Sequence, residues 1–512
     1  MTEYDVVVVG GGATGAGLLR DLAMRGVRSL LVEQGDLATG TTGHFHGLLH
    51  SGARYAVRDP DAARECIEEN RVVRRIAAPA VEDTGGLFCW LEGDPDDYPA
   101  QLLAGCRAAG IEIHEVPAEA ARRDEPLLTP ALRRAFAVPD ATIEPWGLVG
   151  GNVEAALELG AGVRRYTRLA GVGVEAGAVR WVELEDVASG ARERVGTAVL
   201  ASAAGYWAGR VARLAGVELE MAPGWGTMVV MNQRLASRVV NRCRAPGDGD
   251  IVVPVGPVSI LGTTDRTLDT DEYEVTRAEV AGIMAEAAAM MPAVAERRVL
   301  RVFAGARPLY DPGHDASDSR FLSRSHTVLD HARDGVEGFV SIVGGKLTTY
   351  RLMAQDTADA VCRKLGVTAP CRTAEEPLPE ARSGRHYRLG DRLTAREDGA
   401  AGADADLVCE CELVSRAMVE EHVAAHGRTP IDDLLRATRL GMGPCQGAYC
   451  ALRAAGILER AEPAGGSSLA PLRGFLDERM KGDRPILWGD QARQLRLNEI
   501  VYREVLDLDH GP

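Results

Sequence analysis

The chain has 512 residues, a length that exceeds one ordinary hydrophobic core and predicts about two to four domains. Its 46% hydrophobic and 26% charged residues are typical of a globular protein. The 58 basic and 74 acidic residues give a formal net charge of −16. Such an acidic surface disfavours nucleic acid and anionic lipid as partners, and an anionic small molecule would need arginines gathered around it.

The N-terminus predicts neither a signal peptide nor an anchor. It enters an apolar strand without the basic stretch that precedes a signal sequence. No run of about 18 or more apolar residues occurs, so no membrane-spanning helix is expected. We therefore expect a cytoplasmic protein, in which the ten cysteines are not paired in disulfides.

A strand, a helix and a second strand are predicted over residues 4–9, 14–25 and 29–33. Gly10, Gly12 and Gly15 lie between the first strand and the helix with G-x-G-x-x-G spacing. In this turn backbone N–H groups approach a pyrophosphate, and the last glycine lets the helix pack closely on the strand. Glu33 ends the second strand, where it would bind ribose hydroxyls and repel a 2′-phosphate. The unit therefore predicts a site for a dinucleotide other than NADP.

Later segments predict further strands and helices. Helices are expected over residues 59–77, around 153–159, and over 276–291 and 347–365, and strands over residues 163–200 and 226–265. Residues 372–406 are rich in Glu, Pro, Arg, Gly and Asp, and they predict a linker around a short ordered patch. Two more helices are expected near residues 470–480 and 490–507.

Two turns favour FAD over NAD. Ala203-Ala-Gly-Tyr-Trp207 follows an apolar strand and resembles the second flavin-binding segment of FAD oxidoreductases. Gly344-Gly-Lys-Leu-Thr-Thr-Tyr-Arg351 opens a helix, and its Gly-Gly turn predicts a nest of N–H groups facing the N1/C2=O edge of a flavin. Lys346 would add a positive charge there. The candidate cofactor-binding residues are Gly10, Gly12, Ala13, Thr14, Gly15, Glu33, Thr41, Thr42, Ala204, Gly205, Gly344, Gly345, Lys346, Leu347 and Thr348.

The candidate metal ligands are Cys409, Cys411, Cys445 and Cys450. Their spacing is C-x-C, a gap of thirty-three residues, then C-x4-C. A helix is predicted within the gap, with Thr429 as N-cap and Pro430 as first residue. Zinc sites prefer C-x2-C pairs and shorter gaps, whereas four thiolates fit a [2Fe–2S] cluster. The pattern resembles the bacterioferritin-associated-ferredoxin-like (BFD-like) domain, and a structural zinc ion is the alternative.

Five motifs carry a wider resemblance: Gly10-Gly-Gly-Ala-Thr-Gly-Ala-Gly17, Gly47-Leu-Leu-His-Ser-Gly-Ala-Arg-Tyr55, Gly262-Thr-Thr-Asp265, Gly305-Ala-Arg-Pro308 and Gly344-Gly-Lys-Leu-Thr-Thr-Tyr-Arg351. They resemble the FAD-dependent sn-glycerol-3-phosphate dehydrogenases. With the cysteine segment, nearly the whole chain resembles the catalytic subunit, designated A, of the anaerobic, multi-subunit type.

The resemblance implies an α/β fold in which an FAD-binding Rossmann-like domain carries an inserted α+β substrate domain, as in D-amino-acid oxidase. A small helical BFD-like domain follows. We expect the oxidoreductase region at residues 1–385, with a flavin part at 1–75, 145–215 and 320–370 and a substrate part at 76–144 and 216–319. A linker at 386–406, the BFD-like domain at 407–457 and a C-terminal tail at 458–512 complete the expected division.

The resemblance also implies a reaction, the oxidation of glycerol 3-phosphate to dihydroxyacetone phosphate by hydride transfer to FAD. Electrons would pass through the cluster to partner subunits and quinone, so that the protein lies at the inner face of the membrane without spanning it. Arg307 and Arg324 are the expected phosphate ligands. Arg54 and Tyr55 are expected beside the flavin, where Arg54 would stabilise the developing alkoxide or the substrate oxygens.

The proton acceptor is not assigned by the sequence. His50 and Lys346 are both candidates, while His44 and His46 are interpreted as ordinary loop histidines.

One stretch departs from the family pattern. Family members commonly carry Lys-Gly-Ser where this chain has Pro223-Gly-Trp-Gly-Thr227, so that Trp225 replaces a charged residue. The alternative function is an FAD-dependent dehydrogenase or oxidase of a hydroxy acid or amino acid, whose carboxylate would bind the same arginines. In that alternative the cysteine domain is a structural zinc or regulatory module.

Overall fold

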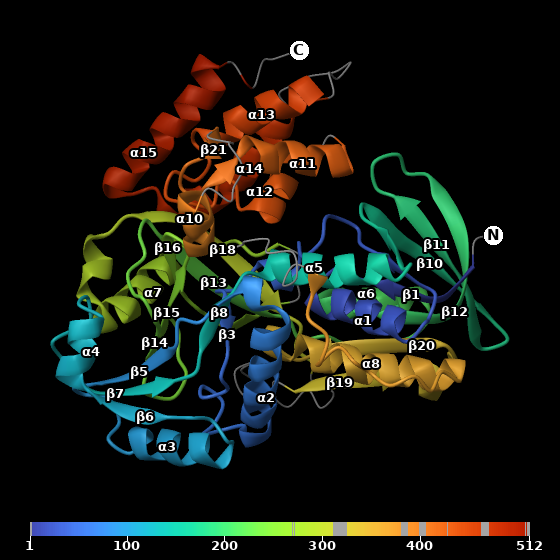
Figure 1. Cartoon of the computed structure of the whole chain (residues 1–512), viewed down its shortest axis with the longest axis horizontal. Coiled ribbons are helices and arrows are strands. Elements are labelled where there is room, and N and C mark those ends of the chain that lie inside the picture. The colour runs from blue at the N-terminus through green and yellow to red at the C-terminus, as the bar shows by residue number, and fades with distance from the viewer. Residues whose placement is uncertain are drawn as a thin grey trace.

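The computed structural model describes residues 3–268, 270, 272–310, 325–379, 388–398, 406–427, 429–461, 470–506 and 508. Two large sheets lie side by side, and the cysteine domain lies with the C-terminal helices across one end of both (Figure 1). No helix in the described part of the chain combines the length and apolar character that a membrane crossing requires.

The first sheet has eight strands, all of which lie in the residues expected to form the flavin part. Its strands run in the order β10-β11-β12-β1-β2-β9, and β20 pairs with both β12 and β19. Its central pairs are parallel, as in a dinucleotide-binding sheet: β1 pairs with β12 and β2, β2 pairs with β9, and β12 pairs with β20. Their bounds are β1 Glu3–Val9, β2 Ser29–Val32, β9 Gly162–Arg164, β10 Thr167–Glu175, β11 Ala178–Asp186, β12 Arg192–Ser202, β19 His326–Asp330 and β20 Phe339–Gly344.

Strand β1 alternates its side chains between two cores, as a strand covered on both faces should. Val6 and Val8 pack with α1 and α8 on one face, while Val7 and Val9 pack beside α6 on the other. The helices of this part are α1 Ala13–Met24, α2 Pro60–Ile76, α5 Pro145–Glu158, α6 Ala208–Leu214 and α8 Tyr350–Leu365. The carboxyl end of β1 is thereby fixed where the glycine-rich turn begins.

The second sheet has nine strands, all of which lie in the residues expected to form the substrate part. Its order is β17-β13-β16-β15-β14-β5-β7-β6, with β18 pairing to β13. Its bounds are β5 Gly86–Leu91, β6 His114–Pro117, β7 Leu132–Val138, β13 Gly224–Met231, β14 Val239–Arg242, β15 Ile251–Val255, β16 Val258–Gly262, β17 Arg266–Thr267 and β18 Val299–Arg307. Its helices are α3 Tyr98–Ala108, α4 Ala118–Asp124 and α7 Arg277–Met290, and a small sheet of β3 Leu48–Leu49, β4 Val81–Glu82 and β8 Ala141–Ile143 joins the two parts.

The cysteine domain has its own hydrophobic core, into which the C-terminal helices pack. Its elements are α10 Leu389–Glu397, β21 Leu407–Cys409, β22 Val414–Ser415, α11 Arg416–His426, α12 Ile431–Thr438 and α13 Cys450–Ala461, followed by α14 Ala470–Asp483 and α15 Gly489–Ile500. Leu472 and Phe475 of α14 are buried in the cysteine-domain core, whereas Ile486 is buried in the core of the substrate sheet. The C-terminal segment therefore packs against both the cysteine domain and the second large sheet.

One predicted helix boundary was wrong. Two helices, α11 and α12, lie between the cysteine pairs, and the second begins at Ile431, with Pro430 as its N-cap and not as its first residue. Thr429 does not cap it, and the Thr429 hydroxyl is buried without a hydrogen-bond partner. A proline side chain carries no hydrogen-bond acceptor, so the helix begins without a side-chain cap.

Candidate active site and cysteine centre

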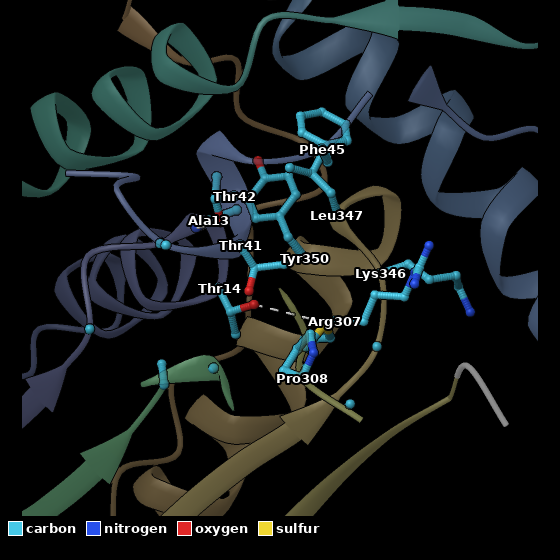
Figure 2. A pocket seen from close by; sticks show the side chains of 18 of the residues that line it. Ala13, Thr14, Thr41, Thr42, Phe45, Arg307, Pro308, Lys346, Leu347 and Tyr350 are labelled. Atoms are coloured by element: carbon cyan, nitrogen blue, oxygen red, sulfur yellow. Dashed lines mark hydrogen bonds between the residues drawn. The ribbon is translucent and has the colours of Figure 1, made fainter. Parts of the chain in front are cut away.

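A cavity of about 1070 Å³ opens between the two large sheets. Figure 2 shows Ala13 and Thr42 toward one side of it and Arg307 and Lys346 toward the other. Of the fifteen candidate cofactor residues, the lining includes Gly10, Gly12, Ala13, Thr14, Glu33, Thr41, Thr42, Ala204, Gly205, Gly344, Gly345, Lys346, Leu347 and Thr348. One continuous space therefore reaches from the glycine-rich turn to the candidate substrate arginines.

The glycine-rich turn has no room for side chains. Gly10 has φ +111°, and a Cβ built on it would lie 2.6 Å from the carbonyl oxygen of Ala203. A Cβ on Gly15 would lie 1.9 Å from the carbonyl oxygen of Gly10. Gly15 does not line the cavity, so its role is the close helix–strand packing that the spacing predicts. Gly12 is the N-cap of α1, and Gly12, Ala13 and Thr14 line the cavity. The Ala13 N–H donates to Thr42 Oγ1 at 3.1 Å, so a pyrophosphate would lie against the other N–H groups of this first turn.

Glu33 is held by the backbone at the same end. Its carboxylate accepts the N–H of Gly11 at 2.7 Å and that of Gly35 at 2.9 Å. Burial raises the pKa of Glu33, and the backbone donors oppose that rise. The carboxylate is thereby aimed at the cavity edge, the position that ribose hydroxyls would need.

The turn at residues 344–348 differs from the predicted nest. Gly344 and Gly345 adopt left-handed φ values of +76° and +79°. Their N–H groups do not face a flavin, because they donate to the carbonyl oxygens of Pro308 at 2.9 Å and Ser325 at 3.3 Å. The next amides open the short helix Leu347–Thr349, and the first turn of a helix leaves its N–H groups without intrahelical acceptors. The donors available to a flavin edge are therefore one to three residues further along than predicted.

Arg307, a candidate substrate ligand, lines the same cavity. Its Nη2 donates to Thr263 Oγ1 at 2.6 Å and to the carbonyl oxygen of Thr264 at 3.0 Å. Its Nη1 donates to the carbonyl oxygen of Gly224 at 3.3 Å and lies 3.2 Å from Asp265 Oδ1. The guanidinium is thus fixed by several acceptors while part of it still faces the cavity, as an anion-binding arginine requires.

Arg54 reaches the same cavity from the loop after β3. Its Nη2 lies 2.5 Å from Asp250 Oδ1, and the Asp250 side chain is only 1% exposed. Arg324, the second arginine expected to bind phosphate, lies outside the described residues.

The candidate proton acceptors stand around one aromatic ring. The His50 and Tyr55 ring centroids are 5.3 Å apart, and Lys346 Nζ lies 5.3 Å from the centroid of Tyr55 on its face. Neighbouring His46 also lines the cavity, and its Nδ1 accepts the N–H of Leu48 at 3.2 Å. Burial, together with the charges of Arg54 and Arg307, lowers the pKa of His46 to about 3. His46 is therefore neutral and presents Nε2–H, which the sequence interpretation of a plain loop histidine missed.

Trp225 does not face this cavity. Its ring is buried and stacks on Tyr273 at 5.5 Å, with Tyr206 at 5.8 Å. It lines a second cavity of about 1170 Å³ bordered by strands of the second large sheet, loops around residues 34–45 and 206–207, and the cysteine domain. The aromatic replacement therefore does not crowd the substrate arginines.

The four candidate metal ligands meet as a chain of thiols. Cys450 is hydrogen-bonded to both Cys409 and Cys445, and Cys445 Sγ lies 4.0 Å from Cys411 Sγ. In the described part of the chain, no group of three or more His, Cys, Asp or Glu side chains is placed to hold one metal ion, so the sulfur contacts are pairwise. Cys409 and Cys450 are buried, while Cys411 and Cys445 are half-buried.

Backbone N–H groups point at these sulfurs. The Cys445 sulfur accepts from Gly447 and Tyr449, and the Cys409 sulfur accepts from Gly441 and Glu412. The hydrogen bond from Cys450 is the largest influence on Cys445 and lowers its pKa to about 5. Donors of this kind tune iron–sulfur clusters, and they favour the thiolate form that a metal needs.

Comparisons with known proteins agree with this geometry. A family model described as FAD dependent oxidoreductase matches residues 5–351, and one described as BFD-like [2Fe-2S] binding domain matches residues 407–460. The anaerobic glycerol-3-phosphate dehydrogenase of Escherichia coli (strain K12) has a subunit, designated A, that is 42% identical over 529 residues, which cover 99% of this chain and 97% of that relative. The subunit designated A1 in the Haloferax volcanii enzyme is 42% identical over 538 residues, covering 99% and 91%.

The chain belongs to the family of these anaerobic glycerol-3-phosphate dehydrogenase subunits. This confirms the predicted family, and the two family models identify FAD and a [2Fe–2S] cluster as its cofactors. The cavity with its glycine-rich turn fits FAD, and the four neighbouring thiols fit the cluster.

Solved structures confirm the predicted fold class. The FAD complex of glycerol-3-phosphate dehydrogenase from Bacillus halodurans has a TM-score of 0.64 at 21% identity, covering 97% of this chain and 94% of that one. The L-alpha-glycerophosphate oxidase of Mycoplasma pneumoniae has a TM-score of 0.58 at 17% identity, covering 74% of this chain and all of that one. At these identities the likeness concerns the fold alone.

Several residues of the site were not singled out by sequence reasoning. Asp250 and Asp265 hold the two arginines, and Thr263 contacts Arg307 directly. Residues 262–265 carry part of the family resemblance, so a signal existed at Thr263 and Asp265 although it assigned them no role. For Asp250 the local sequence carried no signal.

Proposed function

We propose that this chain oxidises sn-glycerol 3-phosphate to dihydroxyacetone phosphate and delivers the electrons through its cysteine domain. The supporting observation is that one cavity is lined both by the glycine-rich turn with Glu33 and by the two fixed arginines, Arg54 and Arg307. A phosphate monoester needs guanidinium donors, and Arg307 lines this cavity with its guanidinium already fixed by neighbouring acceptors. The relatives at 42% identity are named for the same reaction.

Arg307 binds the phosphate in this proposal. Its Nη2 is anchored by Thr263 and Thr264, so the guanidinium is already oriented before substrate arrives. Arg54 lies on the same loop as His50 and Tyr55, and we assign it to the C2 oxygen, where negative charge develops as the hydroxyl proton leaves.

The reaction removes a hydroxyl proton and a hydride from C2 of the substrate. FAD, when bound, accepts the hydride, and the cluster carries electrons singly. The chain must accept the proton, and His50 or Lys346 beside Tyr55 would do so. Leu347 and Thr348 would face the flavin edge with their amides, and Lys346 would add charge there.

Cys409, Cys411, Cys445 and Cys450 hold the [2Fe–2S] cluster in this proposal. The N–H groups that already point at their sulfurs would stabilise its negative charge. We further propose that partner subunits take the electrons to quinone, because the relatives are each named as one subunit of an anaerobic enzyme and match almost end to end.

The test is anaerobic mixing of the purified holoprotein with glycerol 3-phosphate, following flavin bleaching and the iron absorbance together. We expect rapid bleaching followed by cluster reduction. Arg307→Ala should raise the substrate concentration needed for half-maximal bleaching about a hundredfold, because a charge-assisted pair is lost.

Arg133→Ala, which removes a half-exposed surface arginine, is the matched control and should change nothing. Glycine and lactate serve as carboxylate substrates in the same assay. Faster bleaching by either of these, or unaltered bleaching of Arg307→Ala by glycerol 3-phosphate, would reject the proposed substrate.

A further inference from the structure

The two substrate arginines are held in different ways. Arg307 donates to Thr263, Thr264 and Gly224 besides its ion pair with Asp265. For Arg54, the only hydrogen-bond partner among the described residues is Asp250, at 2.5 Å. The position of Arg54 therefore depends on one carboxylate, whereas that of Arg307 does not.

Asp250 lies behind Arg54 and does not line the cavity. Its Oδ1 accepts from Arg54 Nη2, and its Oδ2 accepts from the N–H of Gly247 at 2.8 Å. It precedes β15 in the substrate part, while Arg54 lies 196 residues earlier on the loop that follows β3. The pair thus crosses from the substrate sheet to the loop that carries His50 and Tyr55.

We propose that Asp250 is a positioning residue of the active site, which aims Arg54 at the reacting C2 oxygen. This inference rests on the proposed function. Asp250 touches neither substrate nor cofactor in this arrangement and acts only through Arg54. Because no other described residue accepts a hydrogen bond from the Arg54 guanidinium, it would lose its orientation without Asp250, and misplacement of about 1 Å can slow a reaction about a hundredfold.

Asp250→Asn is the informative variant because the amide cannot replace both oxygens. If its oxygen faces Arg54, its NH₂ meets the N–H of Gly247, and if it flips, its NH₂ meets Arg54. We expect the limiting rate of flavin reduction at saturating glycerol 3-phosphate to fall about a hundredfold, while the half-saturating concentration stays within about threefold. Asp265→Asn should have a much smaller effect on the limiting rate, because Arg307 keeps three neutral acceptors.

Asp94→Asn is the matched control. Asp94 forms a similarly buried pair with Arg242, at 2.7 Å, on the same sheet but outside the cavity lining. It should share any loss of thermal stability with Asp250→Asn but keep the wild-type rate of flavin reduction. An equal loss of rate in both variants would mean that the Asp250 pair is merely structural.

A double-mutant cycle tests the role of Asp250 even if Asp250→Asn alone does not fold. The double variant Arg54→Gln, Asp250→Asn leaves no unpaired buried charge. If Asp250 acts only through Arg54, the double variant reduces its flavin at the rate of Arg54→Gln alone. A further multiplicative loss in the double variant, or a wild-type rate in folded Asp250→Asn, would overturn the inference. Failure of the wild-type protein to be reduced by glycerol 3-phosphate would instead reject the proposed function.

Discussion

Some residues of the site could be predicted from the sequence and others could not. Glu33 and the glycines were found because their spacing is local, within one turn and two strands. Asp250 was not, because it meets Arg54 across 196 residues, and nothing in its own surroundings marks it. The N–H groups of Gly344 and Gly345 were misassigned because their acceptors, Pro308 and Ser325, are also set by the tertiary fold.

His46 gives a prediction for pH dependence. Its pKa is about 3 in the folded chain and near 6.5 in an unfolded one, mainly because burial disfavours the charged ring. As pH falls below 6.5 the unfolded state gains a proton that the folded state does not, so stability is lost by at most about 1.4 kcal/mol per pH unit. His46→Gln should therefore show a shallower fall of the thermal midpoint between pH 6.5 and pH 4.

The measurement is thermal unfolding of each variant across that pH range. His114→Gln replaces an exposed histidine and should keep the wild-type slope. Parallel curves for wild type and His46→Gln would show that His46 does not stay neutral in the folded protein.

At the scale of elements, periodicity located the long helices well. Helices α2, α7 and α8 lie within a few residues of their predicted ranges because each has a continuous apolar face and a clear start or stop. The strand pairing that builds the substrate sheet could not be predicted, since β5 pairs with β7 and also with β14, more than a hundred residues later. Pairing of distant strands leaves no periodic trace in either segment.

Helix α1 provides a prediction at this scale. Gly15→Ala would place a methyl group against the carbonyl oxygen of Gly10, a backbone atom that cannot move without displacing β1. We expect the purified variant to lose most of its FAD and to unfold at a lower temperature. The ratio of flavin to protein absorbance and a thermal scan measure both effects.

Gly282→Ala is the matched control for that variant. Gly282 lies in helix α7, and a Cβ built on it meets nothing within 4 Å. Alanine there should stabilise the helix by up to about 1 kcal/mol and leave FAD content unchanged. Full FAD content in Gly15→Ala would contradict the packing role of Gly15.

At the scale of the whole molecule, the cysteine domain is fixed to the flavin part by charges and one shared aromatic side chain. Arg436 Nε lies 2.7 Å from Asp36 Oδ2, and the Tyr166 hydroxyl donates to Asp433 at 2.5 Å. Trp146 packs against the core of the cysteine domain and against a core of the flavin part. The sequence predicted both parts but not this contact, because no motif spans the boundary.

Helix α14 gives a prediction about the cluster. Arg479 is buried, and its guanidinium donates to the carbonyl oxygen of Gly441 at 3.0 Å and to Gln446 Oε1 at 2.8 Å. These bonds hold both ends of the loop that carries Cys445. Arg479→Ala should therefore lower the iron content per FAD at least about twofold, because buried acceptors are left unpaired.

Iron and sulfide analysis of the purified variants checks this expectation. Lys481→Ala, on the exposed side of the same helix, should keep full iron content. Normal iron in Arg479→Ala would mean that the loop keeps its shape without α14.

The C-terminal helices have a consequence for how the protein matures. Phe475 lies against Gly447, Arg479 holds the loop, and the Tyr502 hydroxyl donates to the carbonyl oxygen of Ala448. These residues leave the ribosome after all four thiols have been synthesised. Iron and sulfide delivered during synthesis would meet a loop that α14 does not yet hold, whereas delivery to the finished chain would meet a loop that is already fixed. The stage at which the cluster is delivered therefore decides whether the loop around Cys445 is already held by the C-terminal helices.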